Sequence, residues 1–235
     1  MRLVIFSDLH GNSLALDAFL KKIEKLSYDR LIFCGDIFGY YYNQKTIIRT
    51  LSAINGLIWL KGNHDAYFQR IYEGKEDAAF YIQQYGHSYE NIRNRFDRKE
   101  AEEIVKKKSK CIFNAEGLKI GVFHGTPKDS LEGRLYPDKP VQNPEEYQKY
   151  DIVILGHTHC RMERMEGSTW IVNSGSLGQP RDGNGYGFAV MDTALRQVEF
   201  QTVEIDQPRL YAQINQYDPH LTKLKEVLER KRGKL

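Results

Sequence analysis

Hydrophobic residues in the first sixty positions alternate between short continuous runs and helical spacing. The run Leu3–Phe6 is apolar throughout, the pattern of a strand buried on both faces. Apolar residues three or four positions apart then predict an amphipathic helix over residues 13–27. The alternation continues with a strand at 31–33, a helix at about 45–54 and a strand at 57–60. This order of elements predicts an α/β fold.

The rest of the chain departs from this rhythm and then returns to strands. Residues 65–110 are aromatic at first and then highly charged, and we expect two or three helices there, on the flank of the core. The proline-rich loop 126–148 is long enough to form the rim of a site. Apolar residues at helical spacing predict a terminal helix within 218–235. Further strands are predicted at 111–113, 118–123, 151–155, 169–172, 187–191 and 197–203.

Composition narrows the class of protein. A chain of 235 residues, 41% hydrophobic and 28% charged, fits one globular domain over residues 1–235. No apolar run approaches the roughly 20 residues that a membrane-spanning helix needs, and no signal peptide is expected. Three cysteines without a CxxC pair favour a reducing cytoplasm. A net charge of +3 suits an anionic substrate but is too small for a nucleic-acid surface, so we expect neither nucleic acid nor membrane as a partner.

Side chains that bind metals follow the predicted strands. Five of the seven histidines come shortly after a strand-like run, with carboxylates and an amide in the same kind of place. Ligands bind α/β sheets where parallel strands end, because the loops there converge on one crevice. The pattern therefore predicts one shared site. Its expected metal ligands are Asp8, His10, Asp36, Asn63, His124, His157 and His159, with His64 and Asp65 beside them.

The spacing and number of these residues suggest two cations. In Asp8-Leu9-His10 and His157-Thr158-His159, alternate residues point to the same side of an extended chain. Seven ligands are too many for one tetrahedral zinc and suit two divalent cations that share a carboxylate. Nitrogen and oxygen donors without a thiolate favour manganese, iron, nickel or zinc.

The ordered motif set resembles that of the calcineurin-like metallophosphoesterases. The similarity runs from residue 3 to about 205, and the stretches Ser7–Asn12, His124–Pro127 and Asn173–Arg181 resemble the small bacterial and archaeal phosphodiesterase branch. It implies a four-layer αββα sandwich of two mixed sheets with a dinuclear site at one edge. The matching motifs are Asp8-x-His10, Gly35-Asp36, Gly62-Asn63-His64-Asp65, His124-Gly125 and Gly156-His157-x-His159.

The resemblance also implies roles for these residues. Asp36 would bridge the two metals, and His64 resembles the family's non-ligand histidine, which contacts the scissile phosphate or protonates the leaving oxygen. The implied reaction is hydrolysis of a phosphodiester, or of a monoester, by hydroxide that the cations make available. The ligands of one metal would be Asp8, His10, Asp36 and His159, and those of the other Asp36, Asn63, His124 and His157.

One motif departs from the protein phosphatases of this superfamily. Their second motif continues Gly-Asp-x-x-Asp-Arg-Gly, whereas residues 35–40 here read Gly-Asp-Ile-Phe-Gly-Tyr. The aspartate that orients the catalytic histidine and the arginine that holds phosphate are both absent. We consider Asp65 as a substitute for the first and Arg181 for the second, with a plain surface arginine as the equal alternative for Arg181. Phosphoproteins are therefore not the expected substrates.

Several functions stay open at this point. Among enzymes, the alternatives to a phosphodiesterase are a phosphomonoesterase and a dinucleoside-polyphosphate hydrolase, all acting on small phosphate esters or nucleotide-like substrates. A nuclease ranks lower because the positive charge is slight. A non-catalytic interaction scaffold ranks lowest, because every ligand position and His64 are filled. The aromatic residues of 67–85 would either pack a helical flank or form a homo-oligomer surface.

Overall fold

The computed structural model describes residues 1–229 and arranges their strands in two five-stranded mixed sheets. The first sheet has the order β10-β9-β1-β2-β3, in which β1, β2 and β3 are parallel and β9 pairs antiparallel with both β1 and β10. Its strands are β1 (Arg2–Phe6), β2 (Arg30–Phe33), β3 (Ile58–Trp59), β9 (Tyr186–Asp192) and β10 (Gln197–Val203).

The second sheet has the order β4-β5-β6-β8-β7, with β5, β6 and β8 parallel and an antiparallel strand at each edge. Its strands are β4 (Lys110–Ala115), β5 (Leu118–Phe123), β6 (Ile152–Leu155), β7 (Arg161–Glu166) and β8 (Thr169–Ser174).

The two sheets pack face to face, and the alternation of side chains along each strand explains why. In β1, Leu3 and Ile5 enter the core between the sheets, while Val4 and Phe6 point to the helices on the outer face. A strand buried on both faces has no polar side to present to water, which is why Leu3–Phe6 reads as one apolar run. The predicted sandwich of two mixed sheets is confirmed.

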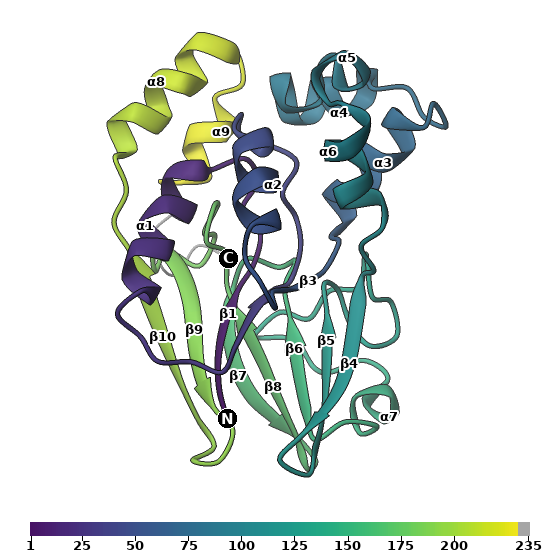
Figure 1. Cartoon of the computed structure of the whole chain (residues 1–235), viewed down its shortest axis with the longest axis vertical. Helices are drawn as coiled ribbons and strands as arrows, with labels where there is room; N and C mark the ends of the chain where they lie inside the picture. Colours follow the sequence, from purple (N-terminus) through teal and green to yellow (C-terminus); the bar gives the residue numbers. More distant parts are fainter. Residues whose placement is uncertain (230–235) are drawn as a thin grey trace.

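Helices cover the outer face of the first sheet and extend beyond the end of the strands. Figure 1 shows α3 to α6 gathered at the same end of the molecule as α8 and α9, above α1 and α2. We call α3 to α6, with the short turn η1, the helical flank. The elements are α1 (Ser13–Ile23), α2 (Gln44–Ser52), α3 (Asn63–Tyr72), α4 (Ala79–Tyr85), η1 (Gly86–Tyr89), α5 (Ile92–Arg95), α6 (Arg98–Val105), α8 (Gln207–Tyr217) and α9 (Lys223–Glu226).

The outer face of the second sheet is covered mainly by a loop. Residues 124–150 contain only the four-residue helix α7 (Pro144–Tyr147), and Leu135 and Tyr147 from this segment pack on the apolar residues of β6. The fourth layer of the sandwich is therefore thin on this side (Figure 1). No helix within residues 1–229 has the length and apolar character that crossing a membrane requires.

Three segments differ in detail from the predictions. The strand β7 was missed, because Arg161–Glu166 carries four charged residues and pairs only along one edge. The helical flank has more elements than the two or three helices expected for 65–110, and it begins at Asn63. Of the terminal helix predicted within 218–235, the described residues contain the short α9, which the unpredicted α8 precedes, and residues 230–235 lie outside the described residues.

Candidate metal centre

The seven predicted ligands meet where strands of both sheets end. Each follows directly on a strand: β1, β2 and β3 of the first sheet and β5 and β6 of the second. All seven side chains are buried. The centre therefore lies in the seam between the sheets, beneath the helical flank. In chain order the ligands are Asp8 and His10 after β1, Asp36 after β2, Asn63 after β3, His124 after β5, and His157 and His159 after β6.

Five of these ligands have a left-handed backbone, which non-glycine residues rarely adopt. Within residues 1–229 ten residues other than glycine have positive φ, and half of them are in this centre. Such conformations persist only where the surroundings impose them, and they concentrate at functional sites. The values are 56° for Asp8, 47° for His10, 68° for Asp36, 67° for His157 and 59° for His159.

Backbone carbonyl groups fix the orientation of three imidazoles. A carbonyl oxygen only accepts hydrogen bonds, so each of these rings carries a proton on Nδ1 and turns Nε2 towards the centre. This is how histidine ligands of metals are usually held. The Nδ1–O distances are 2.6 Å from His10 to Phe38, 2.7 Å from His124 to Cys34 and 2.7 Å from His159 to Gln179.

The first group of ligand atoms has the spacing of a coordination sphere. Two ligands that are each about 2.1 Å from one ion lie roughly 3.0–3.4 Å apart, depending on the coordination geometry. The Nε2 atom of His159 lies 3.0 Å from Nε2 of His10 and 3.4 Å from Oδ1 of Asp8. These three residues form one cluster able to hold a cation.

The second group lies around Asp36, which also faces His10 of the first group. His124 Nε2 lies 3.1 Å from Oδ1 of Asn63 and 3.5 Å from Oδ2 of Asp36, and the same Asp36 oxygen lies 3.8 Å from His10 Nε2. The Asn63 amide is oriented by Tyr67, whose hydroxyl accepts its Nδ2–H at 2.9 Å. Asp36, His124 and His157 form a further cluster able to hold a cation. Asp36 thus lies between His10 of the first group and His124 of the second.

The carboxylates show that the centre suits cations. Asp8 Oδ2 accepts the backbone N–H of His157 at 3.1 Å, and Asp36 Oδ1 accepts that of His64 at 2.9 Å. The other oxygen of each group, Asp8 Oδ1 and Asp36 Oδ2, is buried without a hydrogen bond. A bare buried carboxylate oxygen is unfavourable unless a positive charge compensates it. These residues fit a metal site.

Burial sets the protonation of the imidazoles. It lowers the pKa of His10 and His159 well below the usual value and that of His157 to about 2, so these rings are neutral and available as ligands. His124 is the exception. Burial alone would lower its pKa, but the neighbouring Asp36, with a smaller contribution from Asp8, raises it to about 9.

The structure corrects the role considered for Asp65. Both of its carboxylate oxygens accept backbone N–H groups, and among residues 1–229 no hydrogen bond joins it to the His64 ring. Asp65 therefore shapes the turn that carries Asp36. The ring of His64 instead has its Nδ1 atom 2.9 Å from the hydroxyl of Tyr89, a residue that the sequence pattern did not single out. The four donors to Asp65 are the amides of Asp36 at 3.0 Å, Ile37 at 2.8 Å, Phe38 at 3.2 Å and Gly62 at 2.9 Å.

A small cavity of about 110 Å³ opens onto the centre. Arg181 lines it and donates from Nη2 to Tyr40 Oη and to Gln179 Oε1, each at 2.8 Å. The sequence did not single out Arg134, which lies in the predicted rim loop. Its Nε donates a hydrogen bond to His157 Nε2 at 2.9 Å. The walls consist of Asp36, Tyr40, Asn63, His64, Tyr67, Tyr85, Arg134, Tyr136, His157, His159 and Arg181.

Two packed mixed sheets with buried imidazoles, carboxylates and an amide at their seam define a metal-dependent hydrolase. The model of the calcineurin-like phosphoesterase superfamily domain matches residues 1–196, and the chain belongs to this family. Members of the family are metal-dependent, and the chain is accordingly a phosphoric ester hydrolase by class.

The chain is also similar to a further protein in sequence and to solved structures in fold. The uncharacterized protein MJ0912 of Methanocaldococcus jannaschii is 27% identical over 230 residues, which cover 90% of this chain and 91% of that protein. Among solved structures, a metallophosphoesterase from Sphaerobacter thermophilus has a TM-score of 0.79 at 20% identity, covering 97% of this chain and 99% of its own. A phosphodiesterase from an archaeon has a TM-score of 0.54 at 17% identity, covering 86% and 100%. The two structures show the shared fold.

Proposed function

We propose that this protein is a phosphodiesterase that works with two divalent cations. The observation that carries the proposal is the pair of bare buried oxygens, Asp8 Oδ1 and Asp36 Oδ2, each facing imidazole Nε2 atoms at coordination spacing. Manganese, iron, nickel and zinc all suit this donor set. The residues that would hold the cations are Asp8, His10, Asp36, Asn63, His124, His157 and His159.

The remaining side chains of the cavity act on the ester. When bound, two divalent cations lower the pKa of a coordinated water and neutralise charge on phosphoryl oxygens. His64 has Nδ1 occupied by Tyr89, which leaves Nε2 for the scissile phosphate or the leaving oxygen. Arg181, anchored by Gln179 and Tyr40, would hold a non-bridging phosphate oxygen. A cavity of about 110 Å³ accommodates a phosphoryl group, so the rest of the substrate lies outside it.

The charge of the cavity favours a second candidate, a dinucleoside-polyphosphate hydrolase. Two divalent cations exceed the charge of Asp8 and Asp36 by two, which the attacking hydroxide and a singly charged diester balance. Two guanidinium groups, Arg134 and Arg181, are then left over, and within residues 1–229 neither forms an ion pair with a carboxylate. A substrate with further phosphates next to the scissile one would neutralise them.

The test is turnover by protein stripped of metal and then supplied with manganese, nickel or zinc. Bis-para-nitrophenyl phosphate reports the diester reaction, para-nitrophenyl phosphate the monoester reaction, and diadenosine tetraphosphate the polyphosphate reaction. We expect metal-restored turnover of the diester. Dominant monoester turnover would overturn the diester assignment, and cation binding without turnover of any of the three would favour the scaffold.

The three free cysteines, Cys34, Cys111 and Cys160, support our inference of a cytoplasmic location.

A further inference from the structure

One buried tyrosine connects the helical flank to the catalytic centre. Tyr89, the last residue of η1, is fully buried, and its hydroxyl lies 2.9 Å from His64 Nδ1 and 3.1 Å from the carbonyl oxygen of His64. The carbonyl can only accept, so the hydroxyl donates its proton there. A lone pair of the hydroxyl oxygen then faces Nδ1, and the ring donates Nδ1–H to Tyr89.

The surroundings of Tyr89 hold this arrangement in place. Ser88, its neighbour in η1, accepts the backbone N–H of Gly39 at 3.0 Å and the side-chain N–H of Gln44 at 3.1 Å. Gly39 has φ of 86°, and a Cβ there would lie 2.5 Å from Nδ1 of His64. Only glycine fits at this position without displacing the ring. The loop after β2 and the turn η1 thus enclose the edge of the His64 ring that carries Nδ1.

No other group in the described chain competes for this role. Within residues 1–229 no carboxylate is hydrogen-bonded to the His64 ring, and Asp65 is occupied by backbone amides. The ring faces of His64 are surrounded by aromatic side chains, whose centroids lie 5.4 Å away for Tyr40, 5.3 Å for Tyr67 and 4.6 Å for Tyr85. These rings restrict its tilt, and the Tyr89 hydroxyl fixes its rotation and tautomer.

We propose that Tyr89 is the positioning residue of His64. It holds the ring as the Nδ1–H tautomer with Nε2 left for the phosphate ester, the task that an aspartate performs in the protein phosphatases of the family. The inference rests on the proposed function. It assigns a role to the helical flank, which contributes the uncharged acceptor Tyr89 to His64. The aspartate that orients this histidine in the protein phosphatases is missing from the second motif. The neutral phenol also leaves the positive charge of the cavity undiminished.

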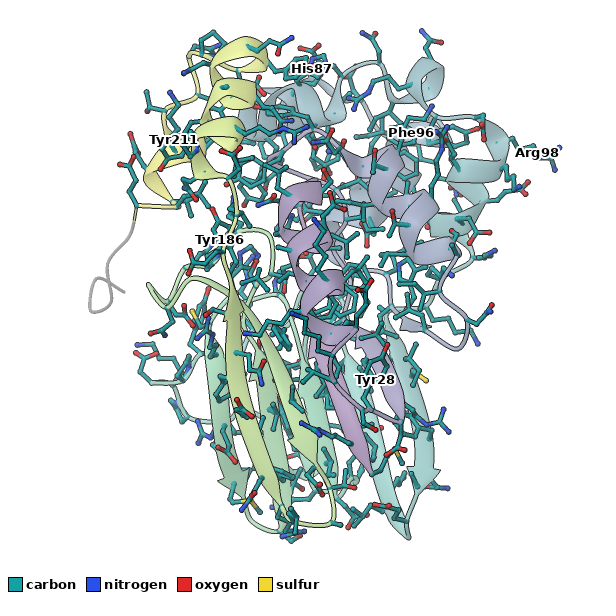
Figure 2. The ribbon with its side chains drawn as sticks, turned by 60° about the vertical axis from the view of Figure 1, so that its left-hand side comes forward. Tyr28, His87, Phe96, Arg98, Tyr186 and Tyr211 are labelled. Atoms are coloured by element: carbon teal, nitrogen blue, oxygen red, sulfur yellow. The ribbon has the colours of Figure 1, made fainter. Side chains whose placement is uncertain are left out.

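Kinetics of zinc-loaded variants test the role. Tyr89→Phe keeps the ring and removes the hydroxyl, and we expect kcat for bis-para-nitrophenyl phosphate to fall about 10- to 100-fold, with KM and zinc content unchanged. In a His64→Ala background the same substitution should cause little further loss, because both act through one group. Tyr186→Phe is the matched control. Its buried hydroxyl donates to Gln207, and it lies at the start of β9 towards α8 (Figure 2), so its kcat should equal that of the wild type.

A spectroscopic measurement tests the tautomer without turnover. In zinc-loaded protein labelled with ¹⁵N-histidine, the His64 signals are identified by their loss in His64→Ala. We expect the Nδ1–H tautomer in the wild type, and a changed Nδ1 signal in Tyr89→Phe but not in Tyr186→Phe. A wild type with the Nε2–H tautomer, or equal losses from Tyr89→Phe with and without His64, would overturn the role of Tyr89. Absence of diester turnover in the wild type would instead overturn the proposed function.

Discussion

The Nε2 atoms of His10 and His159 lie 3.0 Å apart, and each presents a lone pair to the other. Both rings carry their proton on Nδ1, which the carbonyl groups of Phe38 and Gln179 hold. Burial lowers the pKa of both imidazoles, so a second proton does not bridge them. Two lone pairs at this distance repel each other, and a cation between them turns the repulsion into attraction. The fold therefore keeps a locally unfavourable arrangement that a metal relieves.

Cation binding should stabilise the protein markedly. At a free manganese or zinc concentration of 100 times the Kd, binding contributes about 2.7 kcal/mol to the free energy of unfolding. For a chain of this size that raises Tm by about 5–10 °C. Thermal unfolding of chelator-treated protein, with and without added cation, measures the effect. An unchanged Tm at saturating cation would contradict a folded-state metal site.

Asp8→Asn should separate stability from metal binding. Asn tolerates the left-handed φ of 56° at this position, and its Oδ1 can still accept from the His157 amide. Its Nδ2 would take the place of the bare oxygen, 3.4 Å from the lone pair of His159. We expect the metal-free variant to be more stable than the wild type by about 1–3 kcal/mol, because a bare buried acceptor is removed.

The same variant should lose the rise in Tm on adding cation and should bind fewer ions, as measured by elemental analysis. Asp17→Asn, on the exposed side of α1, is the control and should leave both quantities unchanged. If metal-free Asp8→Asn is less stable than the wild type, our account of the bare oxygen is wrong.

His64→Ala should retain its metals and lose turnover. One ring nitrogen of His64 lies within 4.8 Å of ligand atoms of His10 and Asp36, so the geometry by itself also allows it to coordinate a cation. Because Nδ1 is bonded to Tyr89, we assign His64 to the ester and expect turnover to fall about 10²- to 10⁴-fold. Metal content and kcat of the same preparation decide between the roles. Loss of one ion on substitution would make His64 a ligand.

The sequence predicted which polar side chains lie together at the strand ends better than it predicted the groups around them. Asp8, His10 and His157 follow buried strands at fixed spacing, and the local pattern indicates that such residues lie at strand ends. Tyr89 contacts His64 from the helical flank, and Arg134 reaches the cavity from the rim loop. The paths of both segments depend on tertiary packing. Tyr89 makes two hydrogen bonds to His64 and Arg134 makes one to His157, and no periodicity of the sequence indicates such contacts.

The strands also differ in how clearly the sequence indicates them. β1 is buried on both faces, so its apolar run was recognised, whereas β7 is an edge strand with charged residues and gave no comparable signal. Asp65 was misread because an aspartate next to a catalytic histidine also suits a backbone turn, and only the structure distinguishes the two uses.

The two cavity arginines should affect substrates according to their charge. Arg134→Gln and Arg181→Gln each remove a charge-assisted hydrogen bond, and we expect KM for diadenosine tetraphosphate to rise about tenfold or more in either variant. For bis-para-nitrophenyl phosphate, which carries one charge, the rise should be smaller. Steady-state kinetics on both substrates gives the comparison. Equal effects on the two substrates would contradict the charge argument for a polyphosphate.

Cation binding should release a proton from the pair His124–Asp36. Nε2 of His124 and Oδ2 of Asp36 lie 3.5 Å apart. Burial raises the pKa of Asp36, and the charge of Asp36 overcomes the effect of burial on His124 to raise its pKa to about 9. The pair therefore retains a proton at neutral pH, and that proton must leave before Nε2 can coordinate a metal.

We expect about one proton released per cation at the His124 site at pH 7, and metal affinity that falls roughly tenfold per pH unit below 9. The stability that His124 contributes falls as the pH rises, whereas the stability that a paired carboxylate contributes falls as the pH drops. Since the folded pKa of His124 is raised, its contribution to the stability of metal-free protein is complete below about pH 6.5 and is lost as the pH approaches 9. Titration calorimetry with zinc in two buffers of different ionisation enthalpy counts the protons. Zinc binding at pH 7 without proton release would mean that His124 is already neutral and that Asp36 does not hold its proton.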